Sequence, residues 1–194
     1  MTRMEALRIL YPDIEEDVVV TIMGAVAAEL YSLGHRSNFF YLEHAMGLAS
    51  SMGLGLALSL PHKRVIVLDG DGSLLMNLGT LSTLAWYAPK NLIHIVFDNQ
   101  SLLSVGGFPT ATSARADLAG IALKSGAEFA ATVRSCDEFR EAWQLAQKRR
   151  QLSMIVAKVD ASGPASFHMD LTLLENRFQF QRWLREHAAD ENTK

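Results

Sequence analysis

The sequence predicts an α/β protein in which a parallel β-sheet carries helices on both faces, with a further helix at the C-terminal end. Two observations predict this fold class. Strand-like apolar runs alternate with segments of helical periodicity from residue 17 to residue 159, without internal repeats or low-complexity linkers. Two of the runs, 65–68 and 93–97, are each followed directly by a polar turn. They therefore form a βαβ unit whose two turns lie at the same edge of the sheet.

Each expected strand is a run of β-branched, aliphatic or aromatic residues. In chain order these runs are residues 17–21, 38–42, 65–68, 93–97, 129–133 and 154–159. Each expected helix carries small or apolar residues at three- and four-residue steps. In chain order these segments are residues 4–10, 25–33, 45–58, 74–84, 117–124, 136–149 and 171–187. Pro12, Gly34 and Gly126 mark helix ends. Residues 102–110 are expected to be a loop, residues 161–166 a flexible segment, and residues from Ala188 a loose polar tail.

Three small residues in the expected helix 45–58 fall four positions apart: Gly47, Ser51 and Gly55. They leave one helical face with almost no side chain, which permits close approach of another backbone or a flat ligand. A tightly packed core helix would explain the same pattern.

Length and composition indicate one domain, residues 1–194, in which 49% of the residues are apolar and can build a core. The net charge of −3 and the absence of a basic cluster argue against nucleic acid as a partner. A single cysteine, Cys136, excludes a disulfide framework and a multi-thiolate metal site. Cys136 begins an expected helix, so a reactive thiol and a plain small residue both stay open.

The first residues have no apolar signal-peptide core. The longest uncharged run, 45–60, is shorter than the ~20 residues that a membrane span needs. We therefore expect a soluble, cytoplasmic protein that does not enter a membrane.

Polar residues follow the two central strands. Asp71 and Asn99 follow neighbouring strands, so we expect them to lie close together, outside the core. Carboxylate and amide oxygens suit Mg²⁺ or Ca²⁺. Gly70 and Gly72 allow the backbone to approach a bound group closely, and the N–H groups near Ser73 favour an anion. Together they indicate a diphosphate bridged to the protein by a divalent cation, although Gly-Asp-Gly alone is common in ordinary turns.

These residues resemble the thiamine-diphosphate motif, which is Gly-Asp-Gly, a spacer of just under thirty residues, and Asn. The resemblance implies that Asp71, Asn99 and the carbonyl of Ser101 hold Mg²⁺. This sequence has Asp98 where the commonest form of the motif has a first Asn. The cofactor-binding residues that the resemblance implies are Met46, Gly70, Asp71, Gly72, Ser73, Asn99, Ser101, Leu102 and Leu103.

A second segment, His44-Ala45-Met46-Gly47, resembles the Gly-x-Met-Gly turn of thiamine-diphosphate enzymes, which binds the aminopyrimidine and supports the bent cofactor. It implies that Met46 contacts the cofactor. His44 replaces the glycine and is our candidate catalytic residue. It could act on the substrate or support the turn, or be a merely tolerated side chain.

Three stretches look most like the sulfopyruvate and phosphonopyruvate decarboxylases, in which this domain can be a separate β subunit: residues 70–79, 87–92 and 104–107. The resemblance implies a thiamine-diphosphate-binding fold and a Mg²⁺-dependent decarboxylase of an anionic 3-substituted pyruvate, giving the aldehyde and CO₂. It also implies a hetero-oligomer with a pyrimidine-binding α subunit that supplies the catalytic Glu. The family's basic segment after the last strand is missing from 160–164. His44, Arg115 and His168 are scattered candidates for contacts with the substrate's second anion.

Three alternatives stay open. A thiamine-diphosphate enzyme of another kind would be an acetohydroxyacid-type carboligase or a 2-oxoacid oxidoreductase, and the single cysteine disfavours an iron–sulfur enzyme within this chain. A noncatalytic module would bind the cofactor without turnover. A plain Mg-nucleotide protein has no support from a Walker-type sequence.

Overall fold

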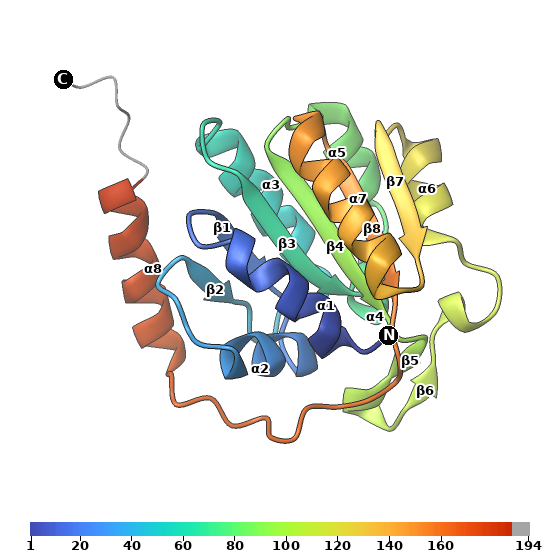
Figure 1. The fold of residues 1–194 in the computed structure, drawn as a ribbon, viewed down its shortest axis with the longest axis horizontal. Coiled ribbons are helices and arrows are strands. Elements are labelled where there is room, and N and C mark those ends of the chain that lie inside the picture. Colours follow the sequence, from blue (N-terminus) through green and yellow to red (C-terminus); the bar gives the residue numbers. More distant parts are fainter. Residues whose placement is uncertain (188–194) are drawn as a thin grey trace.

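The computed structural model describes residues 1–187, and the predicted polar tail from residue 188 lies outside them. Six strands form one sheet in the order β2-β1-β3-β4-β8-β7, and every neighbouring pair is parallel (Figure 1). The strands are β1 (Val18–Thr21), β2 (Phe39–Tyr41), β3 (Val65–Gly70), β4 (Leu92–Asp98), β7 (Phe129–Val133) and β8 (Ser153–Lys158). The predicted fold class is confirmed.

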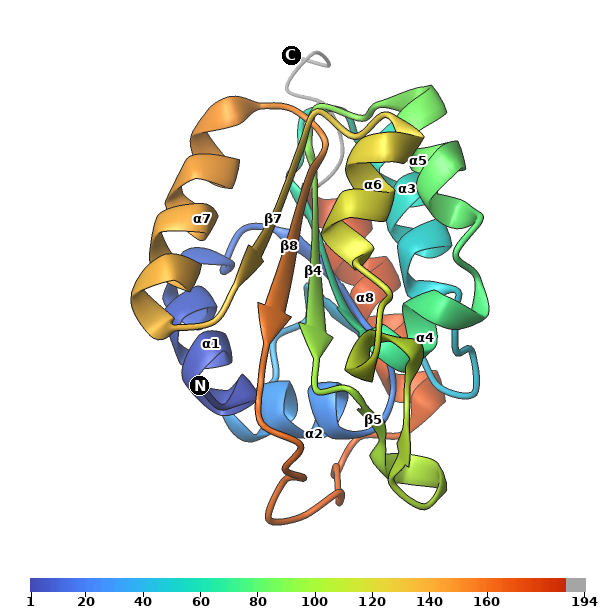
Figure 2. The same ribbon diagram turned by 90° about the vertical axis from the view of Figure 1, so that its right-hand side faces the viewer.

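Helices cover both faces of the sheet. Figure 2 shows α1 and α7 on one face and α3, α5 and α6 on the other. The helices are α1 (Arg3–Leu10), α2 (Ala25–Ser32), α3 (Ala49–Ser59), α4 (Asp71–Met76), α5 (Thr80–Tyr87), α6 (Leu118–Ser125), α7 (Cys136–Arg149) and α8 (Leu173–His187). Short 3-10 turns add Tyr11–Asp13, Leu103–Val105 and Ala111–Ser113. No helix of the described chain has both the length and the apolar character that a membrane span requires.

The core lies along the central strands. All of β4 is buried, and β3 is buried from Val65 to Asp69, as expected for parallel strands covered on both faces. On α3, Gly53 faces β3 so closely that a Cβ there would overlap the side chain of Val67. This close contact is where the small residues of α3 are needed.

The expected small-residue face of 45–58 is wrong at Gly47. The helix begins only at Ala49, because Gly47 adopts a φ of +83° in the preceding turn and so cannot be part of a right-handed helix. Ser51 and Gly55 are exposed, so the glycine that meets the sheet is Gly53.

The single helix expected over 74–84 is two helices, α4 and α5, separated at residues 77–79. The side-chain amide of Asn77 donates to the carbonyl of Gly47 at 2.9 Å. Asn77 therefore bonds the turn before α3 instead of continuing α4. The break also lets Leu74 and Leu84 both remain buried.

The expected loop 102–110 contains a small antiparallel hairpin of β5 (Ser101–Leu102) and β6 (Phe108–Pro109). Beyond β8, the chain crosses the carboxyl edge of the sheet and reaches α8 beside β2 (Figure 1). Asn176 of α8 accepts from the backbone N–H of Tyr41 at 3.0 Å and donates to the carbonyl of Phe39 at 2.7 Å. The edge strand is thus paired by a side chain and covered by a helix.

Candidate functional site

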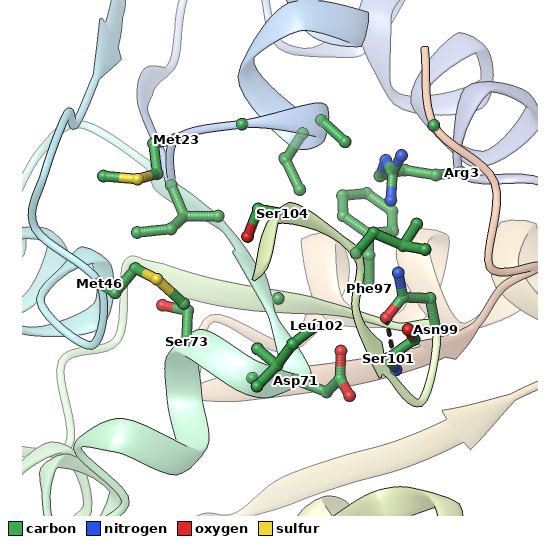
Figure 3. Close-up of a pocket in the computed structure, with 18 of the residues that line it drawn as sticks. Arg3, Met23, Met46, Asp71, Ser73, Phe97, Asn99, Ser101, Leu102 and Ser104 are labelled. Atoms are coloured by element: carbon green, nitrogen blue, oxygen red, sulfur yellow. Dashed lines mark hydrogen bonds between the residues drawn. The ribbon is translucent and has the colours of Figure 1, made fainter. Parts of the chain in front are cut away.

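A pocket opens at the carboxyl edge of the sheet, between the ends of β1 and β3. The chain leaves β1 toward β2 but leaves β3 toward β4, so this point is the topological switch of the sheet, where open α/β sheets bind ligands. Figure 3 shows the pocket walls. They comprise residues 22–26 after β1, residues 70–73 after β3, Met46, Phe97, Asn99, residues 101–104, Arg3, Gly163 and Phe167.

Asp71 lies in the floor of this pocket with only 2% of its surface exposed, so the expectation that it lies outside the core is wrong. Thr110 and Thr112 donate their hydroxyl groups to Asp71 Oδ2, at 2.6 and 3.1 Å. Burial raises the pKa of Asp71 and repulsion from Asp98 adds to the rise, while the two hydroxyl groups oppose it. No cationic side chain pairs with Asp71 in the part of the chain that the structure describes.

Asn99 and Ser101 lie on the same side of the pocket as Asp71 (Figure 3). Asn99 Oδ1 accepts the backbone N–H of Ser101 at 3.0 Å, an Asx turn that fixes the side-chain amide. The geometry therefore brings together the three residues that the motif predicts as metal ligands.

Asp98, the last residue of β4, stabilises the arrangement of these three residues through its hydrogen bonds. It is buried and accepts from the hydroxyl of Thr112 at 2.7 Å, from the N–H of Gln100 at 3.1 Å, and from Lys158. The single proton of the Thr112 hydroxyl is shared between Asp98 Oδ1 at 2.7 Å and Asp71 Oδ2 at 3.1 Å, so the turns after β3 and β4 are held in one network. Asp98, which stands where the common motif has its first Asn, thus has a structural role.

The donor set fits a hard divalent cation. The described residues contain no group of three or more His, Cys, Asp or Glu side chains that could hold a metal alone. One carboxylate, one amide oxygen and one carbonyl would leave coordination positions for water and phosphate oxygens, which is how proteins usually hold Mg²⁺. A cation would also offset the unpaired charge of buried Asp71.

The Met46 turn is fixed to the same site. The N–H of Gly47 donates to Ser73 Oγ at 3.0 Å, and Asn77 donates to its carbonyl. Leu102 packs directly over Gly72, where a Cβ would overlap its side chain. The predicted cofactor-binding residues all line the pocket: Met46, Gly70, Asp71, Gly72, Ser73, Asn99, Ser101, Leu102 and Leu103.

His44 lies outside this pocket. It lines an adjoining cavity with Glu43, Tyr41 and Phe167. Its backbone is left-handed, with a φ of +53°, its side chain is 88% exposed, and Nε2 lies 3.9 Å from Glu43. The other candidates for anion contacts are elsewhere, because Arg115 lines a separate polar pocket with Lys158, and His168 is exposed. The structure does not bring these three residues together.

Sequence reasoning missed part of the site. Gly24, with a φ of +77°, turns the chain from β1 into α2, and residues 22–26 line the pocket. A glycine between a strand and a helix was the available signal. Arg3 and Phe167 come from the two ends of the chain, and nothing in the sequence pattern indicated them.

Comparison with known proteins assigns the family. Residues 20–157 match the family model "Thiamine pyrophosphate enzyme, C-terminal TPP binding domain". The chain is 42% identical over 144 residues to sulfopyruvate decarboxylase subunit beta of Methanocaldococcus jannaschii, covering 74% of this chain and 76% of that protein. It is 42% identical over 142 residues to phosphonopyruvate decarboxylase of Streptomyces viridochromogenes, covering 73% of this chain and 35% of that longer protein.

Solved structures support the fold. Benzoylformate decarboxylase from Polynucleobacter necessarius superposes with a TM-score of 0.70 at 20% identity, covering 84% of this chain and 34% of that one. The predicted family and the predicted cofactor, thiamine diphosphate, are both confirmed by the match over residues 20–157. This chain belongs to the family of C-terminal TPP-binding domains of thiamine pyrophosphate enzymes.

Proposed function

We propose that the chain is the β subunit of a thiamine-diphosphate- and Mg²⁺-dependent decarboxylase. Its substrate is a pyruvate with a second anion on carbon three, 3-sulfopyruvate or phosphonopyruvate, and its products are the aldehyde and CO₂. The observation that carries the proposal is the pocket at the switch point, where the family's motif residues meet in a chain similar to a sulfopyruvate decarboxylase β subunit.

Asp71, Asn99 and the carbonyl of Ser101 are the proposed ligands of Mg²⁺, which links them to the cofactor's diphosphate. Three features support this assignment: the hard oxygen donors, the buried carboxylate that has no cationic partner among the described residues, and the Asx turn that fixes Asn99. Thiamine diphosphate supplies the nucleophilic carbon and the electron sink for decarboxylation when it is bound.

The chain's apolar side chains shape the rest of the pocket. Met46 lines it from the turn before α3, and Leu102 and Leu103 line it from the hairpin side. These side chains exclude water around the reacting part of the cofactor, which strengthens electrostatic interactions there. Gly47 holds Met46 in place through Ser73 and Asn77.

The proposal includes a partner subunit that supplies the catalytic Glu. Asp71 is the only acidic side chain among the described residues that line the pocket, and it is the proposed metal ligand. Glu43 lines only the adjoining cavity. Exposed apolar side chains on the segments around the pocket support a covered surface: Leu48, Leu103, Val105, Phe108 and Phe167.

The experiment is to purify the chain with its partner subunit and to screen 2-oxo acids for CO₂ release with Mg²⁺ and thiamine diphosphate. We expect 3-sulfopyruvate or phosphonopyruvate to be turned over far better than pyruvate. Better turnover of pyruvate or an aromatic 2-oxo acid would contradict the substrate assignment but not the cofactor. Cofactor binding without turnover of any 2-oxo acid would identify a noncatalytic module instead.

A further inference from the structure

Residues outside the family match reach the cofactor pocket from both ends of the chain. The match covers residues 20–157, yet Arg3, Gly163 and Phe167 also line the pocket. Arg3 is the only cationic side chain among the described residues that line it. Figure 3 shows its guanidinium group directed into the pocket, on the same side as Phe97 and Asn99 and away from Met46.

The guanidinium group of Arg3 is held in a fixed orientation. Nε donates to Glu29 Oε2 and Nη2 donates to Glu29 Oε1, both at 2.9 Å. Nη2 also donates to the carbonyl of Ser162 at 3.0 Å. Arg3 and Glu29 are 4% and 5% exposed, so this bidentate pair is shielded from solvent and geometrically well defined.

One edge of this guanidinium group makes no hydrogen bond to the described residues. Nη1 has no hydrogen-bond partner among the described residues. It is also not among the fully buried unpartnered side-chain nitrogens, of which the described chain has one, His94 Nδ1. Nη1 is therefore not completely enclosed. A residue as buried as Arg3 gains most from an anionic acceptor there, because charged donors form the stronger hydrogen bonds.

The position of Arg3 in the pocket determines which part of the cofactor it would contact. Asp71, Asn99 and Ser101 mark the diphosphate end of the pocket, and Met46 marks the aminopyrimidine end under the proposed function. In Figure 3, Arg3 is drawn on the side of the pocket that carries Asn99 and Ser101, opposite Met46. The N-terminal end of α2, with its N-cap Gly24, also lines the pocket.

We propose that Arg3 is a further cofactor-binding residue, whose Nη1 donates to the terminal phosphate of thiamine diphosphate, and that Glu29 is its positioning residue. The inference rests on the cofactor and diphosphate placement of the proposed function, and it is independent of the substrate. It also explains why helix α1, which precedes the family match, packs against α2 at the pocket.

Arg3 could instead serve only as an anchor, because it joins α1, α2 and the segment after β8. The two roles differ in what they do to ligands that share the thiamine ring. A phosphate contact affects the diphosphate more than the monophosphate, whereas loss of an anchor weakens both alike. The ratio of the two affinities therefore separates the roles.

The test is calorimetric titration of the apo complex of the chain and its partner subunit with thiamine diphosphate and with thiamine monophosphate, in Mg²⁺. We expect Arg3→Gln to weaken thiamine diphosphate at least tenfold more than thiamine monophosphate. Arg3→Lys should recover part of that difference. Arg8→Gln removes the same charge from an exposed position on the same helix and should change neither affinity.

Glu29→Gln keeps the proposal falsifiable if Arg3→Gln does not fold. It removes the carboxylate that orients the guanidinium, so the preference for thiamine diphosphate over the monophosphate should fall in the same direction as in Arg3→Gln, but by less. Equal weakening of both ligands by Arg3→Gln, or an unchanged diphosphate preference in Glu29→Gln, would overturn the assignment of Arg3 and Glu29. Absence of thiamine diphosphate binding in the wild type would contradict the proposed function itself.

Discussion

The turns after β3 and after β2 lie at the same edge of the sheet but differ in how they are supported. Asp71 after β3 is buried and receives two hydroxyl groups that the hairpin and its flanking turn place on it. His44 after β2 has a left-handed backbone and an exposed side chain, whose Nε2 lies 3.9 Å from Glu43. The turn after β3 is supported by other residues of this chain, whereas the turn after β2 leaves its His44 side chain exposed.

This difference separates two tasks. Anchoring a diphosphate needs a rigid group of oxygen donors, and the network of Asp98, Thr112 and Asp71 supplies one before any ligand binds. Acting on a substrate needs groups that surround the reacting atoms, and the exposed His44 lies outside the cofactor pocket. We infer that this chain provides the anchoring half of the site and that a partner completes the reacting half.

The largest expected effect comes from Asp71→Asn, which keeps the shape of the side chain but removes its charge. We expect thiamine diphosphate affinity in Mg²⁺ to fall by about a hundredfold or more, since even groups that only support metal ligands are worth roughly 10–100-fold. Calorimetry measures it. Asp137→Asn, which changes an exposed side chain of α7, is the matched control. Unchanged affinity in Asp71→Asn would refute the anchoring role.

A change at His44 tests the other side of the comparison. If His44 contacts the substrate, His44→Gly should lower kcat/KM by roughly 10–100-fold, because a hydrogen bond to a charged group contributes about 1.5–3 kcal/mol. Thiamine diphosphate affinity should stay the same, because His44 does not line the cofactor pocket. Full activity in this variant would mean that His44 is merely tolerated.

Gly47→Ala should weaken the contacts that Gly47, in the turn after β2, makes with Ser73 and Asn77 beyond β3. Gly47 has a φ of +83°, and an added Cβ would lie 3.0 Å from Cβ of Asn77. The left-handed backbone alone should reduce the free energy of unfolding by about 1–2 kcal/mol. Gly55→Ala is the control, because that helical position has open space around it and should be stabilised by about 0.5–1 kcal/mol. Equal unfolding midpoints in the two variants would contradict this account.

The smallest effect concerns pH. Burial raises the pKa of Asp71 above its ordinary value of 3.8, so the folded apo protein holds this proton more tightly than the unfolded chain does. Its contribution to stability is therefore present at low pH and is lost as pH rises through the raised pKa. Asp71→Asn should raise the apo Tm at pH 7 by about 2–4 °C for each kcal/mol regained.

Two observations would test this predicted direction of the pH dependence. Thermal unfolding of the apo protein should show the gain of Asp71→Asn shrinking as the pH is lowered toward 4. Added Mg²⁺ and thiamine diphosphate should reverse the order, because only the wild type then has its metal ligand. An apo Tm that falls in Asp71→Asn at pH 7 would show that the ionised carboxylate stabilises the fold.

Local patterns predicted the sheet and the motif, because a buried strand and a polar turn each leave their mark within a few residues. The rest depends on distant contacts. Asn77 ends α4 because Gly47, thirty positions earlier, accepts its amide. Thr110 and Thr112 support Asp71 from just beyond a hairpin whose residues the sequence showed only as a loop, 102–110. Arg3 lies just before the expected helix 4–10 and carried no functional signal in the sequence; its pairing with Glu29 fixes it in the pocket.

The most direct test of the central claim is decarboxylation of 3-sulfopyruvate and phosphonopyruvate by the chain alone and by the chain with its partner, at saturating Mg²⁺ and thiamine diphosphate. We predict turnover only in the complex, and its loss when Asp71 is replaced by Asn. Robust turnover by the isolated chain, persisting in Glu43→Gln, would show that this chain carries both halves of the site and would contradict the account.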